Sequence, residues 1–124
     1  MSDVSLQFDD HVLLRAVERA AERGVRAAAK VLRERCRQAV GTPYPPASQP
    51  GDPPRRRSGA GRESIVAVAE PGGLAARVGA RGHLALLEFG TRRVARRPWL
   101  VSTLLAQREE LAGAASEAMR DELT

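Results

Sequence analysis

Side chains suited to catalysis are sparse in this sequence of 124 residues. Its two histidines, His11 and His83, belong to no pattern that contains a serine or cysteine nucleophile. The acidic pairs at 9–10 and 109–110 fall at helix starts or on polar helix faces, where the helix dipole or solvation explains them. With one cysteine, Cys36, and no clustered carboxylates, a zinc site is not indicated. We therefore expect no enzyme activity and no metal or cofactor.

Arginine supplies the other chemistry, and it is concentrated in two clusters. One cluster spans 55–62 and the other spans 92–97, while Lys30 is the only lysine. The planar guanidinium pairs with phosphate and with carboxylate by two parallel hydrogen bonds. A basic DNA-binding module is therefore one interpretation. Aromatic residues, which stack on single-stranded bases, make up only 3% of the chain, and no helix-turn-helix or zinc-finger pattern occurs.

Segregated charge offers another use for the arginines. Residues 41–62 and 81–97 are net basic, whereas residues 98–124 are net acidic. Such a chain can pair head to tail with identical subunits, and these contacts close into rings when the rotation allows. Much of the 43% hydrophobic content is alanine, so we expect a thin core that partner subunits complete. No membrane span or signal peptide is indicated, and we expect a soluble protein made in the cytoplasm.

The elements that position these residues begin with a long helix. Asp9 or Asp10 can cap a helix that runs to about Val40, and Gly41 is a natural stop. Apolar residues recur in steps of three and four, which predicts one buried face: Leu14, Val17, Ala21, Val25, Ala28, Leu32, Cys36 and Ala39. Gly24 within this helix predicts close approach of a neighbour. The cysteine on this face is expected to be a buried thiol.

A proline-rich segment comes after the helix. Residues 41–61 hold most of the chain's prolines, which lack an amide donor and exclude helix or central strand. We expect an extended arm or a long loop of about twenty residues, a length that is uncommon in a compact domain unless it is functional or disordered. The remainder of the chain, 62–124, is too short to be an independent domain. The chain is therefore predicted to be one domain, 1–124, with residues 1–8 as a loose arm.

The second half predicts a small sheet and a final helix. Residues 63–80 resemble a β-hairpin that turns at Pro71, and residues 83–89 a short helix. Residues 91–94 are a candidate third strand, and Pro98 suits the first turn of a last helix that ends near Leu123. This order predicts an α+β fold, with two long helices packed on one face of a small antiparallel sheet.

The stretch LEFGTRRVARRPWL, at 87–100, is predicted to be a structural joint. Phe89 is expected to fill the core beneath the sheet, and Gly90 to make the turn before Thr91. Trp99 would bury about 200 Å² and anchor the last helix or a neighbour's groove. Glu88 is either solvated or paired with an arginine of its own or an adjacent subunit.

Two motifs resemble a known family. YPPASQPGDPPRRRSGAGRESI, at 44–65, is similar to the first signature of the neck or tail-completion proteins of lambdoid siphophages. LALLEFGTRRVARRPWL, at 84–100, is similar to the second, in which Glu-Phe-Gly-Thr precedes Arg-Pro-Phe-Leu and a C-terminal helix. Ser58, Gly61 and Leu84 depart from the family's pattern. The resemblance implies a virion structural protein with no catalytic residue.

The function expected from the resemblance is that of a head–tail connector component. It implies a homo-oligomeric ring, six-fold or a multiple, between portal-proximal proteins and the tail tube, with possible non-specific contact to passing DNA and none to membrane. A tail-terminator ring that caps the tube is an alternative, as is the DNA-binding module. The candidate interface residues are Tyr44, Pro45, Pro46, Arg55, Arg56, Arg57, Glu88, Arg92, Arg93, Arg96, Arg97 and Trp99, and the turn or core residues are Phe89, Gly90, Thr91 and Pro98.

Overall fold

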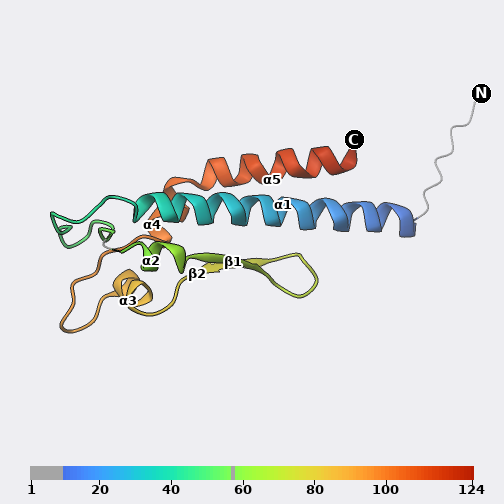
Figure 1. Cartoon of the computed structure of the whole chain (residues 1–124). Helices are drawn as coiled ribbons and strands as arrows, with labels where there is room; N and C mark the ends of the chain where they lie inside the picture. The colour runs from blue at the N-terminus through green and yellow to red at the C-terminus, as the bar shows by residue number, and fades with distance from the viewer. Residues whose placement is uncertain (1–9, 57) are drawn as a thin grey trace, which may run out of the picture.

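The computed structural model describes residues 10–56 and 58–124. Within them the chain forms five helices and one antiparallel pair of strands, arranged in three layers (Figure 1). Helix α1 (Asp10–Ala39) is the central layer, helix α5 (Arg108–Leu123) lies along one side, and the strands lie along the other. The mixed helix-and-sheet prediction is confirmed. The two long helices do not share a face of the sheet, however, because α1 separates α5 from the strands.

Helix α1 is covered over only part of its length. Its buried residues are Ala20, Gly24 and Cys36, whereas Leu14 and Val17 are exposed. Helix α5 runs antiparallel to α1, so that Glu110 near its start meets Arg35 and Glu122 near its end meets Arg19. The first turns of α1 extend beyond that last contact. The prediction of one continuous buried face was therefore wrong for the N-terminal turns of α1.

Close packing between α1 and α5 depends on Gly24. A Cβ atom built at this position would lie 2.9 Å from Cγ of Met119 and 3.2 Å from the carbonyl oxygen of Ala115. The helices therefore approach more closely than an alanine at this position would permit, which confirms the prediction made from the glycine. Hydrogen-bonded ion pairs along the same contact, from Arg19, Arg23 and Arg35, fix the register of the two helices.

The last helix is interrupted. Helix α4 (Val101–Ala106) ends at Gln107, whose φ of −105° and ψ of 11° leave helical geometry, and α5 starts at Arg108. A single helix over 98–123 was predicted. Because of this break, α4 lies beside the core whereas α5 runs back along α1. The spacing of apolar residues in the sequence does not indicate such a change of direction.

The hairpin consists of β1 (Val66–Ala69) and β2 (Ala76–Gly79), with Val66 opposite Gly79 and Ala69 opposite Ala76. Gly72 and Gly73 turn the chain with φ values of 90° and 75°, which only glycine adopts readily. Glu70 and Arg77 form an ion pair across the hairpin. The predicted hairpin is thus present, and α1 contacts both strands.

Residues 91–94 do not form the predicted third strand. The amide of Thr91 donates to the carbonyl of Val94 at 2.8 Å, and the Thr91 Oγ1 accepts hydrogen bonds from the amides of Arg93 and Val94. A threonine side chain that satisfies nearby amides favours a tight turn over a strand. The described sheet therefore has two strands.

The proline-rich segment is a loop that closes on the body of its own chain. The amide of Tyr44 donates to the carbonyl of Arg56 at 2.8 Å, and the amide of Arg56 donates to the carbonyl of Thr42 at 2.8 Å. Farther along, the amide of Gly51 donates to the carbonyl of Arg96 at 2.9 Å. The long-loop prediction is confirmed for the described residues, and the extended arm is not. Short helix α2 (Ala60–Glu63) comes after the loop.

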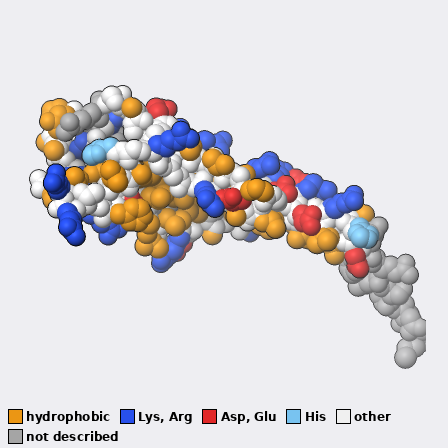
Figure 2. All heavy atoms as spheres, turned by 90° about the horizontal axis from the view of Figure 1, so that it is seen from below, with side chains coloured by type: hydrophobic (Ala, Val, Ile, Leu, Met, Phe, Trp, Pro, Cys, Tyr) orange, Lys and Arg blue, Asp and Glu red, His pale blue; other side chains and the backbone are white. Residues whose placement is uncertain are grey.

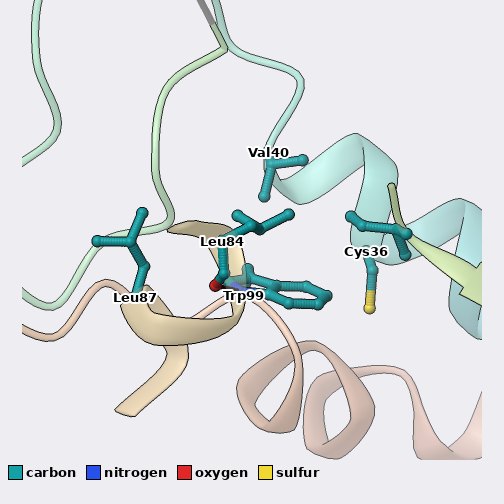
Figure 3. Close-up of a cluster of buried hydrophobic side chains, with 6 residues drawn as sticks. Cys36, Val40, Leu84, Leu87 and Trp99 are labelled. Carbon is teal, nitrogen blue, oxygen red and sulfur yellow. Dashed lines mark hydrogen bonds between the residues drawn. The ribbon is translucent and has the colours of Figure 1, made fainter. Parts of the chain in front are cut away.

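The core lies where the C-terminal end of α1 meets the short helix α3 (His83–Phe89) and Trp99 (Figure 3). It is small, as the alanine-rich composition predicted, and its buried members are Cys36, Val40, Ile65, Leu84, Leu87 and Trp99. Among the helices of the described residues, none combines the length and apolar character that crossing a bilayer requires.

Candidate functional site

Glu88 is the centre of the joint between α3 and α4. It is 2% exposed, and its carboxylate accepts hydrogen bonds from the backbone amides of Trp99 (2.8 Å), Leu100 (2.8 Å) and Val101 (3.0 Å). These are amides at the start of a helix, which have no partner within the helix. The side chain is not solvated and pairs with no arginine among the described residues, so those two predictions are wrong, whereas a pair with an arginine of an adjacent subunit stays a prediction. Arg96 donates instead to the backbone carbonyl of Glu88, at 3.0 Å.

Trp99 joins the same two helices from the other direction. Its ring is 1% exposed and lies between α3 and the end of α1 (Figure 3). The indole Nε1 donates to the carbonyl of Leu84 at 2.7 Å, and Thr103 Oγ1 donates to the carbonyl of Trp99 at 2.7 Å. The expected anchoring role is therefore filled within the chain, and the ring is not available to a neighbour's groove.

Phe89 has the opposite environment from the one predicted. Its side chain is 81% exposed, although it comes directly after the buried Glu88. Leu84, Leu87 and Glu88 take the inward face of α3, so Phe89 at its last position points outward. Phe89 is therefore a large apolar side chain that the single chain leaves exposed.

Gly90 makes the turn after α3, as the sequence predicted. Gly90 has a φ of 75°, and its amide donates to the carbonyl of Leu86 at 2.8 Å. A Cβ atom at Gly90 would lie 3.0 Å from the backbone nitrogen of Arg96. Pro98 lies three residues before α4, outside the helical turn in which it was predicted. Thr91 holds the turn through the two amides described above.

A cavity of about 430 Å³ lies beside the joint, between the proline-rich loop and α3. Its charged and polar lining includes Tyr44, Arg55, Arg56, Arg62, His83 and Arg97, and its apolar lining includes Val40, Leu84, Leu87 and Val94. Among the described residues that line it there is no aspartate or glutamate. The two arginine clusters, which are far apart in the sequence, therefore contribute to one cavity.

Hydrogen bonds to main-chain groups and to Ser48 hold two of these arginines. Arg97 donates from Nε to Oγ of the buried Ser48 at 2.9 Å, and Arg62 donates to the carbonyl of Arg37 at 3.3 Å. No ion pair within the described ranges joins Arg55, Arg56, Arg62 or Arg97 to a carboxylate. The positive charge of the cavity is thus not neutralised by the part of the chain that the structure describes.

Within the described ranges, the remaining predicted interface residues do not line this cavity. Arg92 and Arg93 are exposed in the turn after Thr91, and Pro45 and Pro46 are exposed in the loop. Arg57 lies outside the described residues. Sequence reasoning missed Ser48 and Arg37, the latter of which donates to the carbonyl of Ile65 at 2.8 Å. No pattern around either residue signals its partner.

The titrating groups of known shift are structural. Burial, together with the smaller effect of the charge of Glu88, raises the pKa of the Cys36 thiol to about 11, so the expected buried thiol is confirmed. Hydrogen bonds from Arg35 and Arg23 lower the pKa values of Glu110 and Glu122 respectively. The acidic last helix therefore pairs with α1 of its own chain at these two positions. Over the described ranges, no group of three or more His, Cys, Asp or Glu side chains could hold a metal ion.

Comparison with known proteins identifies no relative of this chain. Protein-family models, curated proteins and solved structures were each compared with the chain, and none of them matches it.

Proposed function

We propose that this chain is a structural virion protein of the phage head–tail connector, a neck or tail-completion protein that assembles as a homo-oligomeric ring between portal-proximal proteins and the tail tube. Support comes from the resemblance of 44–65 and 84–100 to the two family signatures. A tail-terminator ring is the alternative within the same class. In either role the protein works by assembly, without a chemical step.

The observation that carries the proposal is the amount of apolar surface that one chain leaves uncovered. Leu13, Leu14 and Val17 are exposed on the first turns of α1, and Val68 and Leu74 are exposed on the hairpin. Figure 2, which views the hairpin side, shows apolar side chains over much of this face. Large contiguous apolar patches on a soluble chain mark surfaces that contact another molecule.

The loop also fits a role in a rigid assembly. Its ends are bridged at Pro43 and Arg56, and Ser48 within it is held by Arg97. A segment that is already closed in one chain loses little conformational entropy on docking. In this form the loop presents arginines at one end of the molecule as a preformed surface. This replaces the extended arm as the connecting element of the proposal.

The test is the oligomeric state, measured by sedimentation velocity and mass photometry on the chain alone and with its neck partners. We expect a discrete ring in at least one of these conditions, burying roughly 800 Å² or more per partner. A chain that stays monomeric in both conditions would refute the proposal.

A second candidate function, duplex DNA binding, is favoured by one observation: Arg55, Arg56, Arg92 and Arg93 form no ion pair within the described ranges. It predicts a gel shift at moderate salt with a steep salt dependence. Neutralising Arg55, Arg56 and Arg57 would abolish that shift. A wild-type chain that gives no shift would remove the candidate, and a shift that persists in this variant would assign the binding to residues other than these three.

A further inference from the structure

The arginine-lined cavity combines two properties that together select a particular class of ligand. Four arginines, Arg55, Arg56, Arg62 and Arg97, are among the residues that line a space of about 430 Å³. Like charges gathered around one concave site raise a positive potential that favours an anion. Because guanidinium binds carboxylate with paired, charge-assisted hydrogen bonds, a carboxylate-bearing ligand satisfies these groups well.

The apolar residues that line the cavity limit the class of ligand further. Val40, Leu84, Leu87 and Val94 contribute to the wall. The volume lies within the usual range for sites that enclose small ligands or a few side chains. A DNA duplex is a convex rod with no apolar side chain to place there, and it cannot enter a space of this size. A peptide that carries both acidic and apolar side chains fits both properties.

The chain itself contains a peptide of this chemistry. The stretch SDVSLQFDD, at 2–10, has three aspartates, Asp3, Asp9 and Asp10, and no lysine or arginine. Val4, Leu6 and Phe8 alternate with polar residues between those aspartates. We propose that this segment of a second copy of the chain docks in the arginine-lined cavity.

The reach of the segment decides between its own cavity and a neighbour's. The segment ends where α1 begins, whereas Val40, which lines the cavity, lies just past the other end of α1 (Figure 1). A helix of 30 residues is about 45 Å long. Nine residues span at most about 32 Å even when fully extended. Residues 1–9 therefore cannot enter the cavity of their own chain, and only another copy can supply them.

This contact would be directional. One copy contributes its N-terminal segment and the next contributes its cavity, so that a row of copies closes into a ring when the rotation between neighbours permits. The inference rests on the proposed function in one respect, namely that copies of the chain meet. The cavity's affinity for the segment can be measured without any ring.

The experiment is a titration of a fluorescein-labelled peptide, residues 2–12, monitored by fluorescence anisotropy. The titrant is the full chain with Asp3→Asn, Asp9→Asn and Asp10→Asn, so that its own segment does not compete. We expect saturable binding that weakens as salt is raised. Adding Arg55→Glu and Arg56→Glu should weaken binding roughly tenfold or more, because two charge-assisted contacts become repulsive.

Three controls separate the cavity from general charge attraction. Arg92→Glu with Arg93→Glu makes the same change in net charge outside the cavity lining and should leave affinity within about threefold. Peptides with Asp→Asn at 3, 9 and 10, or with Leu6→Ser and Phe8→Ser, should each bind more weakly. Unchanged melting temperatures show that the variants are folded. No binding, equal weakening by both arginine pairs, or displacement of the peptide by a short DNA duplex would overturn the inference.

The outcomes distinguish this inference from the proposed function. Peptide binding by a chain that remains monomeric with all its neck partners would support the cavity's role and refute the connector. Rings that form equally well with and without Arg55→Glu and Arg56→Glu, in a chain that does not bind the peptide, would refute the cavity's role and support the connector.

Discussion

At the scale of single residues, the joint depends on one buried carboxylate. Glu88 accepts three backbone hydrogen bonds at the start of α4, and its neighbour Phe89 is exposed. The two neighbouring residues therefore have different roles: Glu88 joins α3 to the start of α4, and the side chain of Phe89 lies in solvent. A buried acid that satisfies helix-start amides is replaceable only by a side chain with the same two acceptors.

Glu88→Gln should therefore destabilise the chain. The amide group of glutamine keeps one acceptor and turns a donor toward a backbone amide, so at least one N–H is left unsatisfied. We expect a loss of about 2 kcal/mol and a melting temperature lower by roughly 10 °C. Differential scanning calorimetry measures this, with the exposed Glu63→Gln as control. Equal melting temperatures for the two variants would contradict the capping role.

Gly90→Val should be disruptive for a different reason. A valine at φ 75° is strained, and its Cβ would lie 3.0 Å from the backbone nitrogen of Arg96. We expect a cost of about 1–3 kcal/mol from the backbone alone. The matched control is Gly113→Val, where no atom lies within 4 Å of the added Cβ. If Gly90→Val melts with the wild type, the turn is not constrained as described.

At the scale of elements, α1 and α5 are joined by charges at the two ends of their contact. Glu110 accepts from Arg35, and Glu122 accepts from Arg19 and Arg23. Both carboxylates have a pKa below their ordinary value of 4.5, chiefly because of these hydrogen bonds. A carboxylate whose pKa is lowered by folding stabilises the folded state above about 4.5, and that contribution is lost as the pH falls further.

The pairing of α1 with α5 should accordingly weaken in acid. We expect the wild type to lose melting temperature as the pH falls from about 4.5 to about 3. Glu110→Gln with Glu122→Gln should melt lower at a pH of about 6 and lose less on acidification, because those two carboxylates no longer titrate. Glu109→Gln with Glu117→Gln is the matched control. Parallel acid profiles for wild type and the first variant would contradict the assignment.

Sequence reasoning succeeded where a local signal was sufficient. Gly24 predicted a close helix approach, Gly90 a turn with positive φ, and the Pro71-Gly72-Gly73 stretch a hairpin; the structure contains all three. It failed where the outcome depended on direction in space. Nothing in the periodicity around Gln107 indicates that the last helix bends, and nothing around Phe89 indicates which face of α3 is inward.

The sequence predicted several residues of the candidate site but not how they are arranged in space. The arginines at 55–56 and 97 were identified, and so was Tyr44, but their meeting in one cavity depends on the closure of the loop between Pro43 and Arg56. That closure is made by main-chain hydrogen bonds, which leave no trace in side-chain identity. The expectation that Glu88 would meet an arginine of its own chain was wrong for the same reason, since its partners within the chain are backbone amides.

At the scale of the whole molecule, the chain is elongated, and its buried core is confined to one end. Cys36, Ile65 and Trp99 lie at the end where α1 meets α3, whereas the first turns of α1 project beyond α5 (Figure 1). Leu13 and Val17 on those turns are exposed. A projection of this kind adds little to the stability of a single chain and offers surface to another.

Leu13→Ser with Val17→Ser should separate folding from assembly. Because both side chains are exposed in the single chain, its stability should change by less than about 1 kcal/mol. Burying each in an interface is worth about 1.5–3 kcal/mol, so the assembly should dissociate roughly tenfold or more readily. Thermal melting and mass photometry measure the two effects, with Arg26→Ser as control. Undiminished assembly would show that these turns of α1 lie outside the interface.

The solitary thiol at position 36 has a practical consequence. It is fully buried beside Trp99, and its pKa of about 11 keeps it protonated at neutral pH, so a thiol reagent can reach a reactive form only when the surrounding core opens. The rate at which a maleimide or disulfide reagent labels Cys36 therefore measures how often the core opens, without any introduced probe. Comparing the labelling rate of the free chain with that of the assembled chain would show how far assembly slows the local opening of each copy.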